Sequence, residues 1–155
     1  SLRSKKVWWK TFLDRLVKGS TKNVLPDYQE KQKLLYKGNI SHDELISYGD
    51  RYRKANRFFD ALEFYQKAKH GPGLREIMAE SISLGDAMLY EQAAKALGAA
   101  PSTEEWNRIG RRAFALKKYL FARYAFEKGG DGNMLDKINK IVVGGNVQKS
   151  DDHKA

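Results

Sequence analysis

The stretch SHDELISYGDRYRKANRFFDALEFYQKA, residues 41–68, decides the fold, because residues 102–129, STEEWNRIGRRAFALKKYLFARYAFEKG, repeat it at an offset of 61. Eight positions correspond between the two stretches at this offset. They are Leu45, Tyr48, Gly49, Tyr52, Phe58, Ala61, Tyr65 and Ala68 in the first, and Trp106, Ile109, Gly110, Ala113, Tyr119, Ala122, Phe126 and Gly129 in the second. An internal repeat of this kind is typical of stacked supersecondary units.

Each copy predicts two helices. Ser41 followed by Glu44, and Ser102 followed by Glu105, are capping-box patterns that mark helix starts. The first helix carries a large residue and then a small one a turn later, and the second carries alanine where two backbones must approach closely. We expect the aromatic side chains of Tyr65 and Phe126 to fill the space between one hairpin and the next.

A weaker middle copy follows 29 residues after the first, with Leu74, Ile77, Met78, Ser81, Ala87, Tyr90, Ala94 and Leu97 at the same positions. No long alternation of β-branched residues indicates a strand, so the chain is predicted to be all-α. The sequence Gly71-Pro72-Gly73 is interpreted as a turn between helices. Three hairpins are about the minimum that a stack of repeats needs for stability.

This pattern resembles the tetratricopeptide repeat (TPR), in which a bulky residue, Leu-Gly and Tyr in the first helix precede Ala, Phe and Ala in the second. The resemblance covers about residues 42–130, although Met78 replaces the glycine of the middle copy and the intervals of 29 and 32 residues are shorter than the family's. It implies a TPR-like superhelix, an α-α hairpin solenoid. N-terminal helices and a C-terminal capping helix, with Met134, Leu135, Ile138 and Ile141 on one face, complete it.

The resemblance also implies a function, since TPR proteins mostly bind peptides or other domains in a concave groove lined by the first helices. We therefore expect a non-catalytic protein–protein interaction scaffold or adaptor that binds a partner protein or an acidic peptide segment. The alternative is that the residues assigned to this groove lie on ordinary solvated helix faces. The residues that the resemblance assigns to the groove as partner-binding are Arg53, Lys54, Arg75, Asn107 and Arg111.

Charge divides the chain into regions. Residues 1–40 hold ten Lys and Arg against three Asp and Glu, so most of the formal net charge of +10 lies there. We expect a basic amphipathic arm over residues 1–40, a helical repeat domain over 41–142 and a disordered tail over 143–155. Residues 27–36 are predicted to form a short helix with Lys31 and Lys33 exposed, and with Tyr28, Leu34 and Leu35 covering the first repeat.

The arm carries an aromatic stripe in which Trp9, Phe12 and Leu16 recur at helical spacing beside Trp8. Three interpretations compete. The stripe docks on the repeats or on a partner protein, which we favour; it lies in an anionic membrane interface; or the arm's lysines contact nucleic acid. The second and third define an alternative function, a peripheral membrane or nucleic-acid adaptor. Self-association through the arm is a further expectation.

Catalytic chemistry has no recognisable motif in this sequence. The chain contains no cysteine, and its three histidines, His42, His70 and His153, lack the spacing of metal ligands. We expect no enzyme activity, no cofactor and no metal. No apolar run is long enough to span a membrane, so a cytoplasmic location is expected, with membrane association through the arm as the alternative.

Overall fold

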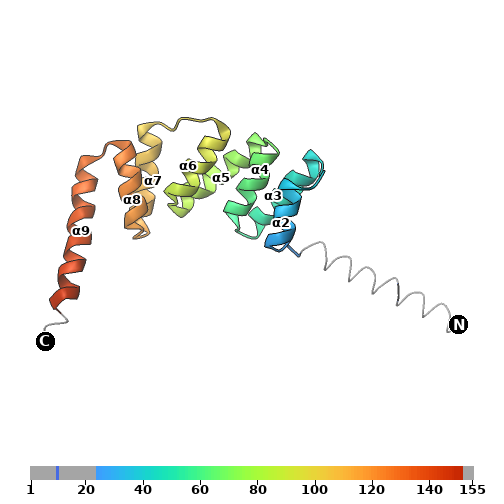
Figure 1. Ribbon diagram of the computed structural model, residues 1–155. Helices are drawn as coiled ribbons and strands as arrows, with labels where there is room; N and C mark the ends of the chain where they lie inside the picture. The colour runs from blue at the N-terminus through green and yellow to red at the C-terminus, as the bar shows by residue number, and fades with distance from the viewer. Residues whose placement is uncertain (1–9, 11–23, 152–155) are drawn as a thin grey trace.

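The computed structural model describes residues 10 and 24–151, and every element of regular structure within 24–151 is an α-helix. This confirms the all-α class for that part of the chain. The helices follow one another in a row, with α2 and α9 at its opposite ends (Figure 1). They are α2 (Tyr28–Tyr36), α3 (His42–Lys54), α4 (Phe58–Lys67), α5 (Gly71–Leu84), α6 (Ala87–Leu97), α7 (Thr103–Ala115), α8 (Tyr119–Gly129) and α9 (Gly132–Asp151).

The helix starts that the sequence predicts are confirmed. Ser41 Oγ accepts the backbone N–H of Glu44 at 3.2 Å, and the Glu44 carboxylate accepts the N–H of Ser41 at 3.3 Å. Ser102 and Glu105 make the same pair of bonds at the start of α7. Each cap satisfies backbone donors that the first turn of a helix leaves open, which is worth about 1 kcal/mol.

The helices pack as successive pairs. Helix α3 packs on α4, α5 on α6, and α7 on α8. Neighbouring pairs then contact each other through their first helices, α3 with α5 and α5 with α7, and through their second helices, α4 with α6 and α6 with α8. At the two ends of the row, α2 packs on α4, and α9 packs on α8.

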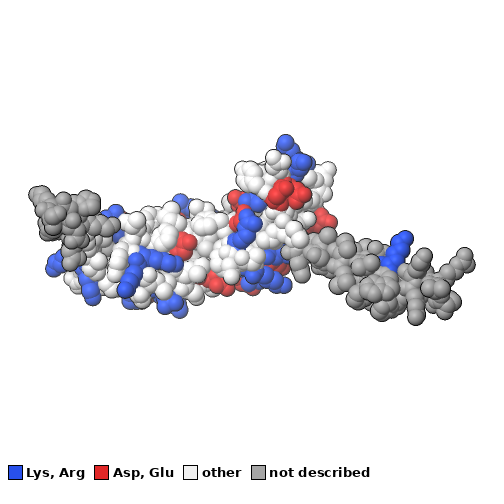
Figure 2. Space-filling view, turned by 90° about the horizontal axis from the view of Figure 1, so that it is seen from below, with Lys and Arg blue, Asp and Glu red and all other residues white. Residues whose placement is uncertain are grey.

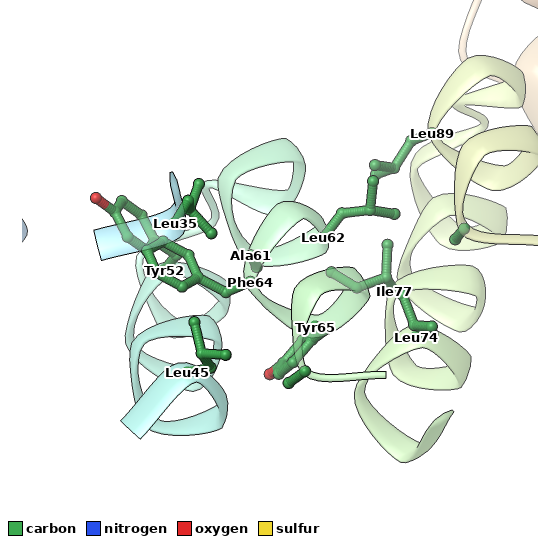
Figure 3. Close-up of a cluster of buried hydrophobic side chains, with 12 residues drawn as sticks. Leu35, Leu45, Tyr52, Ala61, Leu62, Phe64, Tyr65, Leu74, Ile77 and Leu89 are labelled. Carbon is green, nitrogen blue, oxygen red and sulfur yellow. The ribbon is translucent and has the colours of Figure 1, made fainter. Parts of the chain in front are cut away.

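Tyr65 fills the space between the first two pairs, as the sequence predicts. A Cβ atom added to Gly49 on α3 would lie 2.6 Å from the Tyr65 ring, and one added to Gly73 on α5 would lie 2.7 Å from it. Figure 3 shows this ring among the buried side chains that join α3, α4 and α5. Both positions therefore require glycine, because a larger residue would clash with the Tyr65 ring. In the third pair, Phe126 packs on Gly110 in the same way and shares a buried cluster with Ile138 of α9.

The middle pair reverses the sizes at these positions. Where the outer copies place glycine on the first helix and a large aromatic residue on the second, the middle copy has Met78 and Ala94. Met78 is half-buried against two core clusters, and Ala94 is buried. The exchange keeps the combined side-chain volume nearly constant, which explains how the degenerate copy preserves the packing.

The interpretation of Gly71-Pro72-Gly73 as a turn is wrong. These residues form the first turn of α5, which begins at Gly71 immediately after its N-cap residue, His70. Proline is compatible with this place because the first N–H groups of a helix have no partner within the helix. The chain reverses at Lys69, one residue before the N-cap His70, and the φ of 51° at Lys69 is left-handed.

Two expectations about α2 are also wrong. Lys31 is buried, with its Nζ 2.6 Å from Asp60 Oδ1 and 2.8 Å from Glu63 Oε2 on α4. Tyr28 is exposed and covers nothing on the first repeat, whereas Leu34 and Leu35 do pack there. The helical pattern of apolar residues cannot reveal that two carboxylates on another helix neutralise a buried lysine.

The last helix is longer than the apolar pattern indicates. We expect a disordered tail from residue 143, but α9 continues as helix to Asp151. Apolar periodicity reports which residues face a core, and backbone hydrogen bonding continues beyond the last buried side chain. The expected domain boundaries stay predictions in other respects.

Candidate partner-binding surface

The first helices of the three pairs form one continuous surface. Because α3 contacts α5 and α5 contacts α7, their outward side chains lie side by side along the row. We call this surface the first-helix face. It is defined by the outward side chains Asp50, Arg53, Lys54, Arg75, Glu76, Ala79 and Arg111, of which Asp50 and Arg53 are half-buried and the rest exposed.

Arg53 lies within a polar network that joins three helices. Its Nε donates a hydrogen bond of 3.2 Å to the hydroxyl of Tyr65, which in turn donates one of 2.5 Å to Asp50 Oδ1. Its Nη2 lies 2.9 Å from Glu76 Oε2 on α5. The guanidinium is thus fixed in place before any partner binds.

The same network perturbs the Tyr65 hydroxyl. Burial, followed by the hydrogen bond to Asp50, raises the pKa of Tyr65 to about 12. The hydrogen bond to Tyr65 is also the largest contribution that raises the pKa of Arg53. At neutral pH, Tyr65 is therefore a neutral donor to Asp50, and Arg53 is charged.

Arg75 and Lys54 are the most available cations of this surface. Both side chains are exposed, and neither has a carboxylate within ion-pair distance among the residues that the structure describes. Arg111 is also exposed, and its guanidinium lies 2.9 Å from Glu104 Oε1 on the same helix. Exposed pairs of this kind contribute roughly 0 to 1 kcal/mol, so a competing carboxylate can replace Glu104 at little cost.

Asn107 has an internal role. Its Nδ2 donates a hydrogen bond of 3.1 Å to the backbone carbonyl of Gly129, at the end of α8. Its Oδ1 is buried, with no hydrogen-bond partner among the described residues. A Cβ atom on Gly129 would lie 1.9 Å from this oxygen, so Asn107 and Gly129 require each other. The structure therefore does not bring Asn107 together with Lys54, Arg75 and Arg111 as a free binding group.

The predicted aromatic binding residues of the arm, Trp8, Trp9 and Phe12, lie outside the described residues. Their role stays a prediction. Within the described part, residues 24–101 hold eleven basic and eleven acidic side chains, whereas residues 102–145 hold nine basic and five acidic ones. Figure 2 shows the same asymmetry on one face, where Lys and Arg predominate over the C-terminal half.

Sequence reasoning missed an apolar groove at the C-terminal end. Its volume is about 590 Å³, and it lies between the start of α8 and α9. The internal repeat contains a signal for it, since Leu120 occupies the position of Phe59, and both side chains are exposed. The residues that line the groove are Lys117, Lys118, Tyr119, Leu120, Phe121 and Val142.

Within the described residues, neither a cluster of metal ligands nor a membrane-spanning helix is found. No three His, Asp or Glu side chains there gather closely enough to hold a metal ion. None of the helices there combines the length and the apolar character needed to cross a membrane. In comparisons with known proteins, the chain matches no family model, no curated protein and no solved structure.

Proposed function

We propose that this chain is a TPR-like scaffold without catalytic activity, and that its first-helix face binds an extended acidic segment of a partner protein. The observation that carries this proposal is the placement of exposed cations on three successive first helices, with Lys54 on α3, Arg75 on α5 and Arg111 on α7. An extended peptide lying across the row would meet all three helices in turn. Charge-assisted bonds to its carboxylates would provide the specificity.

The packing supports a solenoid of repeats as the fold behind this function. The same glycine and aromatic pair recurs in the first and third hairpins, and among the described helices each hairpin contacts only its neighbours in the row. Repeat proteins built in this way present long surfaces whose shape comes from the small rotation between units. An elongated ligand suits such a surface better than a small molecule does.

The fixed position of Arg53 adds to the proposal. Because Tyr65 and Glu76 already orient its guanidinium, little side-chain entropy remains to be lost when a ligand carboxylate approaches. Glu76 is itself exposed and would repel an acidic ligand locally. The binding path is therefore expected to run past Lys54, Arg75 and Arg111, on the side of Arg53 away from Glu76.

Attachment to a membrane or to nucleic acid depends on residues 1–40, most of which lie outside the described part of the chain. No described contact favours it over the scaffold. A cytoplasmic location likewise stays a sequence prediction.

Fluorescence anisotropy with a short labelled poly-glutamate peptide tests the proposal on the full chain. The double variant Arg75→Glu with Arg111→Glu should weaken binding by about tenfold or more, as expected when two charge-assisted contacts become repulsive. The matched control is Arg123→Glu with Lys140→Glu, which makes the same change of charge on exposed residues of α8 and α9. It should leave the affinity within about twofold of that of the unaltered chain, as for charges outside a contact.

Equal weakening by both double variants would show that binding follows net charge alone and would contradict the assignment to the first-helix face. Binding that neither variant weakens would assign the peptide to the basic arm. Far-UV circular dichroism of each variant, compared with that of the unaltered chain, excludes loss of helix as the cause.

A further inference from the structure

The row begins with a helix in the register of a second helix. Helix α2 packs on α4, as α4 packs on α6 and α6 on α8, whereas first helices pack on first helices. In the second helices, as in α3 and α7, the fourth and eighth residues after the N-cap are buried; in α4, α6 and α8 the pairs are Ala61 with Tyr65, Tyr90 with Ala94, and Ala122 with Phe126. Helix α2 shows the same pattern, because Lys31 and Leu35 are the fourth and eighth residues after its N-cap, Asp27. Within the described residues, no first helix is paired with it.

The row ends with a helix in the register of a first helix. Leu135, Ile138 and Val142 follow Trp106, Ile109 and Ala113 at an offset of 29, the interval that also separates the first and second copies. Asp131 accepts the N–H of Met134 at 3.1 Å, as Ser41 and Ser102 accept a backbone N–H at the starts of α3 and α7. Among the described helices α9 packs on α8 and, through Lys137, on the Phe114 ring of α7, and none of them covers the side on which a second helix would pack.

The apolar groove lies on this open side. Its residues Lys117–Phe121 correspond, at the repeat offset of 61, to residues 56–60, which line a smaller pocket of about 300 Å³ at the start of α4. The opposite wall of that smaller pocket is formed by Leu84, Asp86 and Leu89, at the end of α5 and the start of α6. The first turn of a following second helix is therefore what closes this kind of pocket.

Two exposed apolar residues mark the missing contact. In the complete hairpin of α7 and α8, Phe114 packs on Tyr119 edge to face, with ring centroids 5.6 Å apart. Phe114 is the twelfth residue after its cap and Tyr119 the first after its own. The corresponding residues are Val143, which is 61% exposed, and Tyr28, which is 74% exposed.

The charges at the two ends are complementary. Asp27 and Glu30 are exposed in the first turn of α2, and Lys117 and Lys118 form the rim of the groove. In the smaller pocket the same positions bring together Arg57 and Asp86, the N-cap of α6. An acidic first turn placed against a basic rim thus follows an arrangement that the chain already uses.

We propose that a second copy of this chain places its α2 on the open side of α9, so that the two helices form a hairpin across the interface. Tyr28 of one copy would pack on Val143 of the other, with the acidic first turn of α2 beside Lys117 and Lys118. The contact joins the α2 surface of one copy to the α9 surface of the other. A pair of bound copies therefore still has one free surface of each kind. Copies would therefore add head to tail.

Sedimentation equilibrium of the full chain over a concentration series tests this. The weight-average mass should rise with concentration beyond about twice that of the 17.7 kDa monomer, because a head-to-tail contact does not stop at two copies. Tyr28→Glu and Val143→Glu should each abolish the rise. Mixed in equal amounts, the two variants should form dimers that do not grow, since each retains the surface that the other lacks.

The matched control is Met88→Glu, which places the same charge on an exposed apolar residue of α6, at the position that Leu120 occupies on α8. It should leave association unchanged. An unaltered chain that stays monomeric throughout, a single variant that still associates, or an equal mixture that stays monomeric would each overturn the proposal. Association that survives Tyr28→Glu and is lost with Trp9→Ala and Phe12→Ala would assign the contact to the arm, and would overturn it too.

Discussion

The hydroxyl of Tyr65 on α4 lies 2.5 Å from Asp50 Oδ1 on α3, while its ring occupies the space between Gly49 and Gly73. One side chain thus joins the first two pairs of helices through apolar packing at its ring and through a polar network at its tip. The tip also holds Arg53, which belongs to the first-helix face. Stability and the proposed binding surface are therefore coupled at this residue.

Removal of this hydroxyl should separate its two roles. Tyr65→Phe keeps the ring between the two glycines but leaves Asp50 and Arg53 without their shared partner. We expect the free energy of unfolding to fall by about 1 to 3 kcal/mol, the cost of leaving half-buried polar groups unpaired. Urea unfolding followed by circular dichroism measures it. The matched control is Tyr36→Phe, whose exposed ring should leave stability within about 0.5 kcal/mol.

The raised pKa of Tyr65 predicts a loss of stability at alkaline pH. The folded-state pKa is about 12 and the ordinary value is 10.0, so the unfolded chain loses this proton first as the pH rises. The contribution is complete below pH 10 and is lost between pH 10 and about 12, to an extent of about 3 kcal/mol at most. Unfolding of the unaltered chain and of Tyr65→Phe across this window should show their difference shrinking. A constant difference would contradict the pKa assignment.

The internal repeat allowed the pairs of helices to be predicted. Gly49 and Tyr65 have the same separation in the sequence as Gly110 and Phe126, and each of these two pairs marks a contact between the helices of one hairpin. Polar contacts between helices of different units leave no such trace. The ion pair of Arg53 with Glu76 joins α3 to α5 through two residues that look solvated in the sequence. Lys31 illustrates the same limit, since only the fold brings it to two carboxylates.

The reversed sizes in the middle copy predict that the third hairpin can be repacked. Gly110→Met alone should cost more than about 3 kcal/mol, because even a Cβ atom would lie 2.8 Å from the Phe126 ring. Phe126→Ala alone should cost about 3 to 5 kcal/mol through the cavity it leaves. Together they reproduce Met78 with Ala94, so the double variant should be more stable than the sum predicts, by about 1 to 3 kcal/mol. A double-mutant cycle from urea unfolding measures this coupling, and additive costs would contradict the explanation of the middle copy.

Lys31 should hold α2 on the rest of the fold. Burial lowers its pKa, but the hydrogen bond that its ammonium donates to Asp60 and its interaction with Glu63 outweigh this effect, and the net pKa is raised above 10.5. Among the described residues, Lys31→Ala leaves Glu63 without a cation and Asp60 with Arg57 alone, which should cost about 1 to 3 kcal/mol because both carboxylates are half-buried. Hydrogen exchange followed by mass spectrometry should show protection lost in α2 before α7 and α8. The control is Lys33→Ala, which changes an exposed lysine of the same helix, and α2 should keep its protection in this variant.

A second tyrosine joins the second and third pairs, and it predicts sensitivity to acid. The hydroxyl of Tyr124 on α8 donates to Glu91 Oε2 on α6, and this bond is the largest cause that lowers the pKa of Glu91 below 4.5. The unfolded chain therefore takes up this proton first as the pH falls. The stabilisation is complete above pH 4.5 and is lost as the pH drops through the lower folded-state pKa.

Tyr124→Phe should remove this dependence. We expect the variant to be less stable than the unaltered chain by about 1 kcal/mol at neutral pH, and the difference should shrink below pH 4.5 because protonated Glu91 gains much less from the lost donor. Lys95 remains 3.1 Å from Glu91 in the variant, so part of the acid sensitivity should persist until Lys95→Met is added. Thermal unfolding from pH 3 to 7 measures both steps. An equal difference at both ends of this range would mean that the hydroxyl of Tyr124 stabilises the fold independently of the charge of Glu91, and would contradict the assignment.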